Sequence, residues 1–578
     1  MFDHYDAAWN ELLAEGSPFA VTEIEVRGNP MRVFAAAPPH MRSLWELALG
    51  YGDRTYVVYE DEHHTYAEIA AQVRALAHLL RETHGVGRGD RVAISMRNYP
   101  EWVVSYWAIL ATGAAVVGMN AWWTSQEMAF GLGDSRPKVL IADDERVERV
   151  LPLLDELRAG QPLHLITVRS DRDLPADAAR WDDVVRAEDA PDGLPEADID
   201  PDDDATIFYT SGTTGFPKGA QLTHRGSVHN VMNIGFMTAC ATLAEQKAIA
   251  AGDLPAPEGG PADPAEPPVF LAPTPLFHVT ANNCLLQPCT MAGGTIAFMY
   301  KWDAARALEL IEREHVTNFS GVPTMSREML LHPDWMIRDT SSLKAMGGGG
   351  APVQPDLVEK IDRSLSGGVP STGYGLTETC GIVTANSSRL YTAKPSSCGR
   401  IVPTLEGRLE DEAGEVLSPG PDVTGELCVR GAVVIKGYLN RPEATADAIR
   451  DGWFHTGDIA RIDEDGFVYI VDRAKDMVLR GGENVYCSEV EAAIYEHPDV
   501  AEAAVFGVPD ERLGEAVAAA IVRTPGSTLD QEQLSEFLGE RIAKFKIPST
   551  VWFRDEPLPR NANGKFLKRE LRDALIEA

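Results

Sequence analysis

The sequence predicts an α/β protein with a large multi-subdomain N-terminal domain, built on largely parallel strands, and a small α+β C-terminal domain. Helical and strand-like patterns alternate over the first 200 residues, and the sequence pattern changes near residue 475. The chain has 578 residues, too many for one hydrophobic core, and 44% of them are hydrophobic. We therefore expect two main units, residues 1–474 and 475–578.

The early alternation contains clear helix and strand signals. Thr65 followed by Glu68 forms a capping box, and an apolar helical face follows it. The short apolar runs at 91–95 (RVAIS) and 138–143 (KVLIAD) have the composition of strands. Strands that alternate with helices in this way are typical of α/β domains with parallel sheets.

Residues 102–119 contain no charged side chain and just reach the length of a membrane span. Gly113 divides them into a helix-like half and a strand-like half, and polar side chains interrupt the segment. A buried helix-turn-strand is the favoured interpretation, and a membrane segment is the alternative. The first 16 residues show no basic segment followed by an apolar run, so no secretory signal is expected.

Two segments are predicted to lie on the surface. Residues 181–204 carry eleven acidic residues and one Arg, as expected of a solvated linker ahead of the strand at 205–209. Residues 241–268 contain eight Ala, six Pro and three Gly, and this composition predicts a mobile loop inserted into the domain. A lid or regulatory role for this loop is left open.

The last hundred residues read as a compact α+β unit. One helix is predicted to open at a capping box of Ser488 and Glu491, and a later helix at Thr528 and Gln531. The run 501–508 (AEAAVFGV) between them has the composition of a strand.

Composition excludes several classes of function. The formal net charge is −35, which opposes binding to nucleic acid or to anionic lipid, because such partners recruit Lys and Arg clusters. The seven cysteines are scattered without a C-x-x-C pair, so we expect reduced thiols in a cytoplasmic protein rather than a disulfide or zinc framework. Peripheral membrane association and a homodimer are left open.

Residues 209–219 (YTSGTTGFPKG) form the most informative segment. Glycines let backbone N–H groups converge, hydroxyls add donors, and a lysine adds positive charge, a combination that suits a polyphosphate. The spacing is not that of a Walker A loop, and the AQLTH that follows looks extended. An ordinary turn is the alternative. The candidate ligands are Thr210, Ser211, Gly212, Thr213, Thr214, Gly215 and Lys218.

Seven further motifs follow in order along the chain. They are PLFH (275–278), GGGGAP (347–352), STGYGLTE (371–378), WFHTGD (453–458), DRAKD (472–476), GGENV (481–485) and PRNANGK (559–565). With the first segment, this ordered set resembles the adenylate-forming (acyl-activating) enzyme superfamily, and most closely its AMP-forming fatty-acid and acyl-CoA synthetases. The resemblance covers nearly the whole chain, apart from residues 241–268.

Several of these residues have a physical interpretation that agrees with the resemblance. The Tyr374 ring could stack on a purine, Thr377 could donate to a phosphate, and Glu378 could hold Mg²⁺ together with Thr210. Asp458, which we expect in a turn, could accept from the ribose hydroxyls, with Arg473 close to the ribose and phosphates. The remaining AMP-binding candidates are Gly349, Gly350, Ala351, Pro352, Gly373 and Gly375.

The resemblance gives Lys565 the central catalytic role. It implies that this ammonium bridges the substrate carboxylate and the adenylate, whereas a solvated lysine is the alternative reading. It also implies a hinge at Lys475, about which the small domain swings after the first half-reaction. The candidate CoA-binding residues are Gly481, Gly482, Glu483, Lys544 and Lys546.

The implied reaction uses ATP, Mg²⁺ and coenzyme A to convert a carboxylic acid into a thioester through an acyl-adenylate. His278 stands where peptide-synthetase relatives usually carry Asp, so the counter-charge for an α-amino group is missing. We expect His278, Gly321, Pro323 and Gly348 to line the acyl pocket, and a medium- or long-chain fatty acid to fill it. An aryl or sterol-derived acid, loading of a carrier protein, and a non-catalytic nucleotide-binding scaffold are the alternatives.

Overall fold

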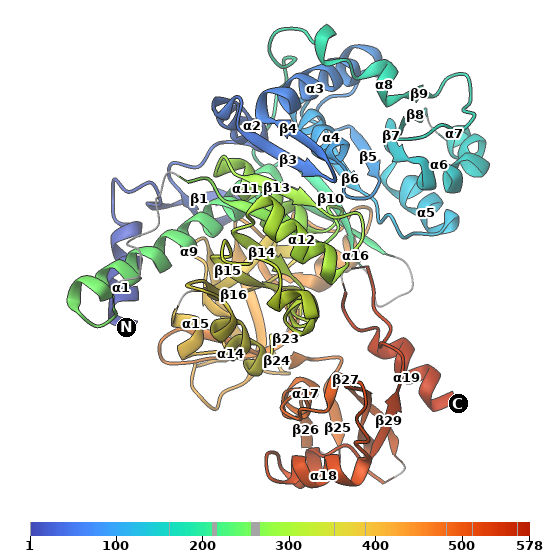
Figure 1. The fold of residues 1–578 in the computed structure, drawn as a ribbon. Coiled ribbons are helices and arrows are strands. Elements are labelled where there is room, and N and C mark those ends of the chain that lie inside the picture. The colour runs from blue at the N-terminus through green and yellow to red at the C-terminus, as the bar shows by residue number, and fades with distance from the viewer. Residues whose placement is uncertain are drawn as a thin grey trace.

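The computed structural model describes residues 2–160, 162–210, 217–255, 266–351, 353–387, 389–480, 483–510, 512–562 and 564–577. A large domain lies above a small C-terminal domain in Figure 1. The chain passes between them after β24 (Phe467–Arg473), a strand of the large domain, and before β25 (Val478–Arg480), a strand of the small one. The predicted α/β class, with a large and a small domain, is confirmed.

The first large-domain sheet has the strand order β11-β10-β6-β5-β7-β8-β9, and its neighbours are parallel except for β10 and β11. Val92 and Ile94 point into one hydrophobic core and Ala93 into another, so both faces of β5 are covered. The strands are β5 (Arg91–Ser95), β6 (Ala115–Gly118), β7 (Val139–Asp143), β8 (His164–Val168), β9 (Ala179–Arg180), β10 (Asp204–Thr210) and β11 (Lys218–Thr223).

The second large-domain sheet runs from β20 at one end to β4 at the other. Its strands β3, β13, β12, β14, β15 and β16 are parallel, and those from β17 onward are antiparallel. The parallel strands and their hairpin partner are β3 (Thr55–Tyr59), β4 (Glu62–Thr65), β12 (Val269–Ala272), β13 (Thr295–Phe298), β14 (Asn318–Gly321), β15 (Ala345–Gly349) and β16 (Val369–Leu376). The antiparallel strands are β17 (Gly381–Ser387), β18 (Gly399–Ile401), β19 (Leu405–Glu410), β20 (Val416–Leu417), β21 (Gly425–Gly431), β22 (Ile449–Arg450), β23 (Trp453–Ile462) and β24. A separate hairpin joins β1 (Val21–Val26) and β2 (Asn29–Phe34).

Helices cover these sheets. The helix predicted after Thr65 is present, and its capping box with Glu68 is formed on both sides. The large-domain helices of seven residues or more are α1 (Phe2–Leu13), α2 (Met41–Ala48), α3 (Tyr66–His78), α4 (Pro100–Ala111), α5 (Ser125–Ser135), α6 (Asp144–Val150), α7 (Leu154–Gly160), α9 (His224–Ala251), α12 (Ala304–Glu314), α13 (Pro323–Leu331), α14 (Pro355–Ser364) and α16 (Pro442–Ala448).

The uncharged segment 102–119 forms the predicted helix-turn-strand. Helix α4 ends at Ala111, Gly113 turns the chain with φ of 80°, and β6 begins at Ala115. Trp102 and Trp107 on α4 are fully buried among other side chains. Among the described residues, no helix has the length and apolar character needed to cross a membrane.

The prediction of a loop at 241–268 is wrong for its first part, residues 241–251, which are helical. Helix α9 continues through Ala251, and Gly252 ends it with a left-handed φ of 82°. Alanine has the highest helix propensity, and Ala241, Ala244 and Ala248 are buried on one face of this helix. The prediction failed because it used the average composition of the whole segment, although alanine dominates the start and proline the remainder. Residues 256–265 lie outside the described residues.

The acidic segment at 181–204 is more regular than the solvated linker that the sequence predicted. Trp181 is buried at the start of the short helix α8 (Trp181–Val184), and Asp204 already begins β10. Between them, Arg88 pairs with Asp198 at 2.9 Å and with Asp203 at 2.7 Å. These ion pairs fasten part of the acidic chain to the large domain.

The small domain packs helices on a sheet with the order β26-β25-β28-β27, and β29 pairs with β28. Its elements are β25, β26 (Glu483–Val485), α17 (Cys487–Tyr495), β27 (Val500–Asp510), β28 (Gly514–Arg523), α18 (Gln531–Gly539), β29 (Thr550–Arg554) and α19 (Lys568–Glu577). The predicted strand at 501–508 is confirmed as part of β27.

Both predicted capping boxes in the small domain are wrong. Helix α17 starts before Ser488, and the Ser488 hydroxyl donates instead to the carbonyl of Val471 in the large domain. Helix α18 is capped by Asp530 with Gln533, two residues after the predicted position. In both cases a tertiary contact or a stronger neighbouring cap replaces the local pattern that the sequence suggested.

Candidate active site

The main cavity among the described residues lies at one edge of the second sheet and is lined on the other side by the small domain. Its volume is about 2270 Å³. The parallel strands β14, β15 and β16 all end at this edge, which is where ligands bind in open α/β sheets. The predicted residues that line it are Thr210, Lys218, His278, Pro323, Gly348, Gly349, Gly350, Ala351, Gly373, Tyr374, Gly375, Thr377, Glu378, Asp458, Arg473, Lys475 and Lys565.

The glycines of β15 serve strand packing. A Cβ atom on Gly347 would lie 1.8 Å from the Ser371 oxygen, and one on Gly348 would lie 1.6 Å from the Gly321 oxygen. Gly348 nevertheless lines the cavity, whereas Gly321 is not among its lining residues, so the expectation that both leave room for an acyl chain stays a prediction. Gly350, just beyond the strand, has φ of 82° and faces the cavity.

A hydrogen-bonded trio occupies one wall. The Tyr374 hydroxyl donates to Asp458 Oδ2 at 2.6 Å, and Arg473 Nε lies 2.9 Å from Asp458 Oδ1. Burial raises the pKa of Asp458 and the Arg473 charge lowers it. Asp458 lies within β23, opposite Arg473 on β24, so the predicted turn is wrong and the sheet register fixes the pair.

A second group gathers around Tyr438, which sequence reasoning missed. Its hydroxyl donates to Glu378 Oε1 at 2.9 Å, and Lys218 Nζ lies 5.2 Å from the centre of its ring. Thr210 Oγ1 donates to the Lys218 carbonyl at 3.5 Å. Tyr438 thus brings together the cation, the carboxylate and the hydroxyl that the sequence placed at the phosphates. A lone tyrosine after a glycine carries no signal that could have revealed this.

Lys565 enters the cavity on a tight loop of the small domain. Arg560 and Phe566 form an isolated bridge across the loop, and the Asn561 amide donates to the Lys565 carbonyl at 2.9 Å. A Cβ on Gly564 would lie 2.8 Å from Val322 Cγ2, so this glycine lets the loop touch the large domain. Enclosure in the cavity, with a smaller effect of Arg473, lowers the pKa of Lys565.

His278 faces the same space. Burial, with the nearby Lys565 ammonium, lowers the pKa of His278 to about 3, so the ring is neutral at pH 7. Its buried Nε2 atom has no hydrogen-bond partner among the described residues. A neutral ring with an unused nitrogen can donate to or accept from a substrate carboxyl group, according to its tautomer.

Two family descriptions match the chain. "AMP-binding enzyme" matches residues 44–439, and "AMP-binding enzyme C-terminal domain" matches residues 489–565. The chain belongs to the AMP-binding enzyme family. Its predicted membership in the adenylate-forming superfamily is thereby confirmed.

Relatives of this AMP-binding enzyme cover almost its whole length. A feruloyl-CoA synthase of Amycolatopsis sp is 38% identical over 511 residues, 88% of this chain and 93% of that protein. A long-chain-fatty-acid–CoA ligase of Bacillus subtilis is 34% identical over 554 residues, 91% of this chain and 93% of that protein. The solved structure of o-succinylbenzoate CoA synthetase (MenE) from Bacillus subtilis, in complex with its acyl-adenylate intermediate, has a TM-score of 0.72 and 29% identity, covering 92% of this chain and 97% of that one.

One face of α9 lines the cavity of this AMP-binding enzyme beyond His278. Its lining positions Val231, Ile234, Thr238 and Ala241 recur at the helical period, over about 15 Å of helix. Facing apolar side chains come from the segment 279–291, and they include Cys284, Leu285, Pro288 and Met291. The cavity therefore continues from the polar groups into a mostly apolar channel.

The other predicted site residues are either outside the described residues or away from the cavity lining. Ser211, Gly212, Thr213, Thr214, Gly215, Pro352, Gly481 and Gly482 lie outside the described residues. Glu483 and Lys544 are exposed on the small domain, away from the cavity lining. Lys546 is already paired with Glu489 at 2.6 Å. In this arrangement the predicted CoA-binding lysines do not meet the other site residues.

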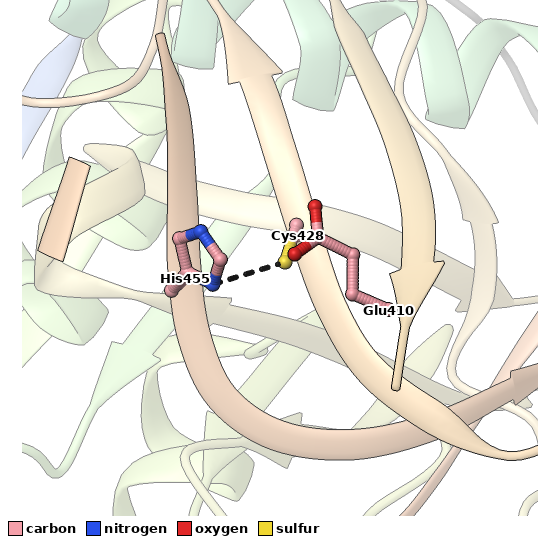
Figure 2. Close-up of side chains that lie close together, drawn as sticks. All are labelled: Glu410, Cys428 and His455. Carbon is pink, nitrogen blue, oxygen red and sulfur yellow. Dashed lines mark hydrogen bonds between the residues drawn. The ribbon is translucent and has the colours of Figure 1, made fainter. Parts of the chain in front are cut away.

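A compact cluster of Glu410, Cys428 and His455 lies on the neighbouring strands β19, β21 and β23 (Figure 2). His455 Nδ1 is 3.4 Å from Cys428 Sγ, and Arg408 Nε donates to Glu410 Oε1 at 2.6 Å. Burial, helped by neighbouring carboxylates, raises the pKa of Cys428 to about 12, which opposes the thiolate that a metal ligand needs. We interpret the cluster as packing between the strands β19, β21 and β23.

Proposed function

We propose that this enzyme joins a carboxylic acid to AMP and then transfers the acyl group to the thiol of coenzyme A. The observation that carries the proposal is the meeting of Lys565, from the small domain, with Glu378, Asp458 and Arg473 of the large domain in one cavity. A carboxylate and a nucleoside triphosphate are both anionic, so both need cationic partners at the point where they react.

In the first step, a carboxylate oxygen attacks the α-phosphorus of ATP. The bond to the bridging oxygen breaks, and pyrophosphate leaves with its electron pair. In this mechanism Lys565 neutralises charge on both reactants, Lys218 and Thr210 bind the phosphates, and Asp458 accepts from the ribose hydroxyls. Glu378 retains one carboxylate oxygen beyond its bond from Tyr438, and with the Thr210 hydroxyl it fits a hard cation such as Mg²⁺. That ion would neutralise the departing pyrophosphate.

In the second step, the thiolate of coenzyme A attacks the acyl carbonyl carbon and AMP leaves with the electron pair of the broken C–O bond. We propose that the small domain turns about Lys475 between the steps. Lys475 lies in the turn between β24 and β25, where the chain crosses from one sheet to the other. Such a turn would withdraw Lys565 from the cavity and admit the thiol.

For the acid, we propose a medium- or long-chain fatty acid. The apolar face of α9 and the segment opposite it support this choice, because they extend the cavity along a length of helix beyond His278. A compact aryl acid is the second candidate, since the feruloyl-CoA synthase is 38% identical to this chain. Neither candidate carries an α-amino group, for which the wall at His278 offers no counter-charge.

The test is an assay with ATP, Mg²⁺ and coenzyme A across acids from acetate to palmitate, together with ferulate and 4-coumarate. We expect AMP, pyrophosphate and thioester to form in equal amounts, with the highest kcat/KM for chains of about eight carbons or more. Preference for ferulate would favour the second candidate. Formation of ADP, or no acid-dependent release of pyrophosphate with any acid, would refute the mechanism. Replacing coenzyme A with a phosphopantetheinylated carrier protein tests the other acceptor.

A further inference from the structure

A second lysine of the small domain occupies an unusual position close to Lys565. Lys568 is the first residue of α19, where a positive charge opposes the helix dipole. Its Nζ lies 2.6 Å from Glu491 Oε1 of α17. The helix dipole disfavours a cation at this position, so the neighbouring carboxylates must stabilise the Lys568 ammonium.

Those carboxylates belong to both domains. Glu491 is buried in the small domain, and its Oε1 also accepts from the Val505 amide at 2.8 Å. Asp472 is buried near the end of β24 in the large domain, and its charge acts on Lys568 together with that of Glu491. These charges raise the pKa of Lys568, and in return the Lys568 ammonium lowers the pKa of Asp472, which burial raises to about 6. The ammonium is therefore paired with Glu491 of the small domain, and its charge also acts on Asp472 of the large domain.

The contact between the domains is close at this point. The Asp472 carboxylate accepts from the amide of Cys487, the first residue of α17. That amide is one of the donors left free at a helix start. Ser488 donates to Val471 beside it. Lys568 thus lies where α17, α19 and the end of β24 meet.

We propose that Lys568 is a positioning residue for Lys565. They are three positions apart, a span of at most about 11 Å of extended chain, so fixing Lys568 limits where the loop can place the Lys565 ammonium. The other end of the loop is held separately, because Arg560 Nη2 pairs with Glu502 Oε1 at 2.5 Å. The Lys568 end is held by the ion pair with Glu491, and the charge of Asp472 in the large domain acts on it as well.

This inference rests on the proposed function, since it assigns Lys568 to the adenylation step that Lys565 serves. The decisive variant is Lys568→Met, which keeps most of the aliphatic stem and removes the charge. We expect acid-dependent pyrophosphate release to slow by about ten-fold or more, because a buried carboxylate loses its partner. Thioester formation from chemically prepared acyl-adenylate and coenzyme A should stay within about two-fold of wild type, and the KM for ATP should change little.

Three further variants separate positioning from folding. Lys568→Arg keeps the charge and should restore most of the pyrophosphate release. Glu491→Gln should show the same selective loss as Lys568→Met, and it provides the test if the methionine variant does not fold. Arg572→Met is the matched control, since Arg572 is a cation of the same helix whose partner is the exposed Asp573, and it should leave both half-reactions unchanged.

Equal loss of both half-reactions in Lys568→Met and Glu491→Gln, or no loss in either, would overturn the inference. A wild-type protein that releases no pyrophosphate with any acid would instead overturn the proposed function. Hydrogen–deuterium exchange still tests the positioning in that case. Amides of the 559–567 loop should exchange faster in Lys568→Met than in wild type, and unchanged exchange would contradict the role.

Discussion

The two domains fix their parts of the cavity by different physical means. In the large domain, Asp458 and Arg473 face each other across the paired strands β23 and β24, and Tyr374 reaches them from β16. In the small domain, Lys565 sits on a loop that ion pairs hold at Arg560 and Lys568. Sheet register thus orders the groups proposed to bind the nucleotide, whereas the ammonium depends on side-chain charges near the domain boundary. Charge changes in the small domain should therefore affect one half-reaction, and changes in the large domain should affect nucleotide binding.

The largest effect should come from Lys565→Ala, which removes the ammonium that the small domain brings into the cavity. Two unit charges about 4 Å apart at an effective dielectric near 20 interact by roughly 4 kcal/mol, and this amounts to about three powers of ten in rate if the contact acts only in the transition state. Single-turnover pyrophosphate release measures the loss. Thioester formation from preformed acyl-adenylate is the control, and an equal loss there would break the proposed contrast between the domains.

The next effect concerns stability in acid and should arise in the large domain. Burial lowers the pKa of His224 to about 3 and that of His229 to about 4. The unfolded chain, with histidine pKa values near 6.5, then binds more protons below that pH. The free energy of unfolding should fall as pH drops from about 6.5 towards 4, by up to about 1.4 kcal/mol per pH unit for each histidine.

Urea unfolding between pH 4.5 and 7.5 measures this dependence. A His224→Gln variant should show a shallower fall, because it removes one of the buried histidines that must stay neutral in the fold. His63→Gln, at an exposed position, is the control and should leave the slope unchanged. A His224→Gln slope equal to that of wild type would show that other groups control acid stability.

The smallest effect should come from Tyr374→Phe, which removes the 2.6 Å hydrogen bond to Asp458. A hydrogen bond to a charged group contributes about 1.5–3 kcal/mol, and Arg473 still holds the other carboxylate oxygen. We expect the KM for ATP to rise by about ten-fold, with a smaller change in kcat. A change confined to kcat would place the hydroxyl in the chemical step instead of nucleotide binding, and so would sharpen the comparison between the domains.

Much of the fold followed from local patterns. The helix after Thr65, the strands at 91–95 and 139–143, and the turn at Gly113 were predictable because each is decided by side chains within a few residues. The ordered motifs also identified the family, and with it several of the charged residues that line the cavity, such as Glu378, Asp458 and Lys565. Local patterns failed where a distant partner decided the outcome, as for Ser488, which bonds to the large domain instead of capping its own helix.

The sequence by itself determined the chemistry present in this protein: a Gly- and hydroxyl-rich phosphate loop, acidic and basic residues in fixed order, and a lysine near the C-terminus. Only the tertiary structure decided that Tyr438 contacts both Lys218 and Glu378, that a Cβ on Gly348 would clash with the neighbouring strand, and that Lys568 pairs with Glu491. The reason is physical. Residue types and local spacing are written along the chain, whereas burial and charge proximity depend on segments that come together only on folding.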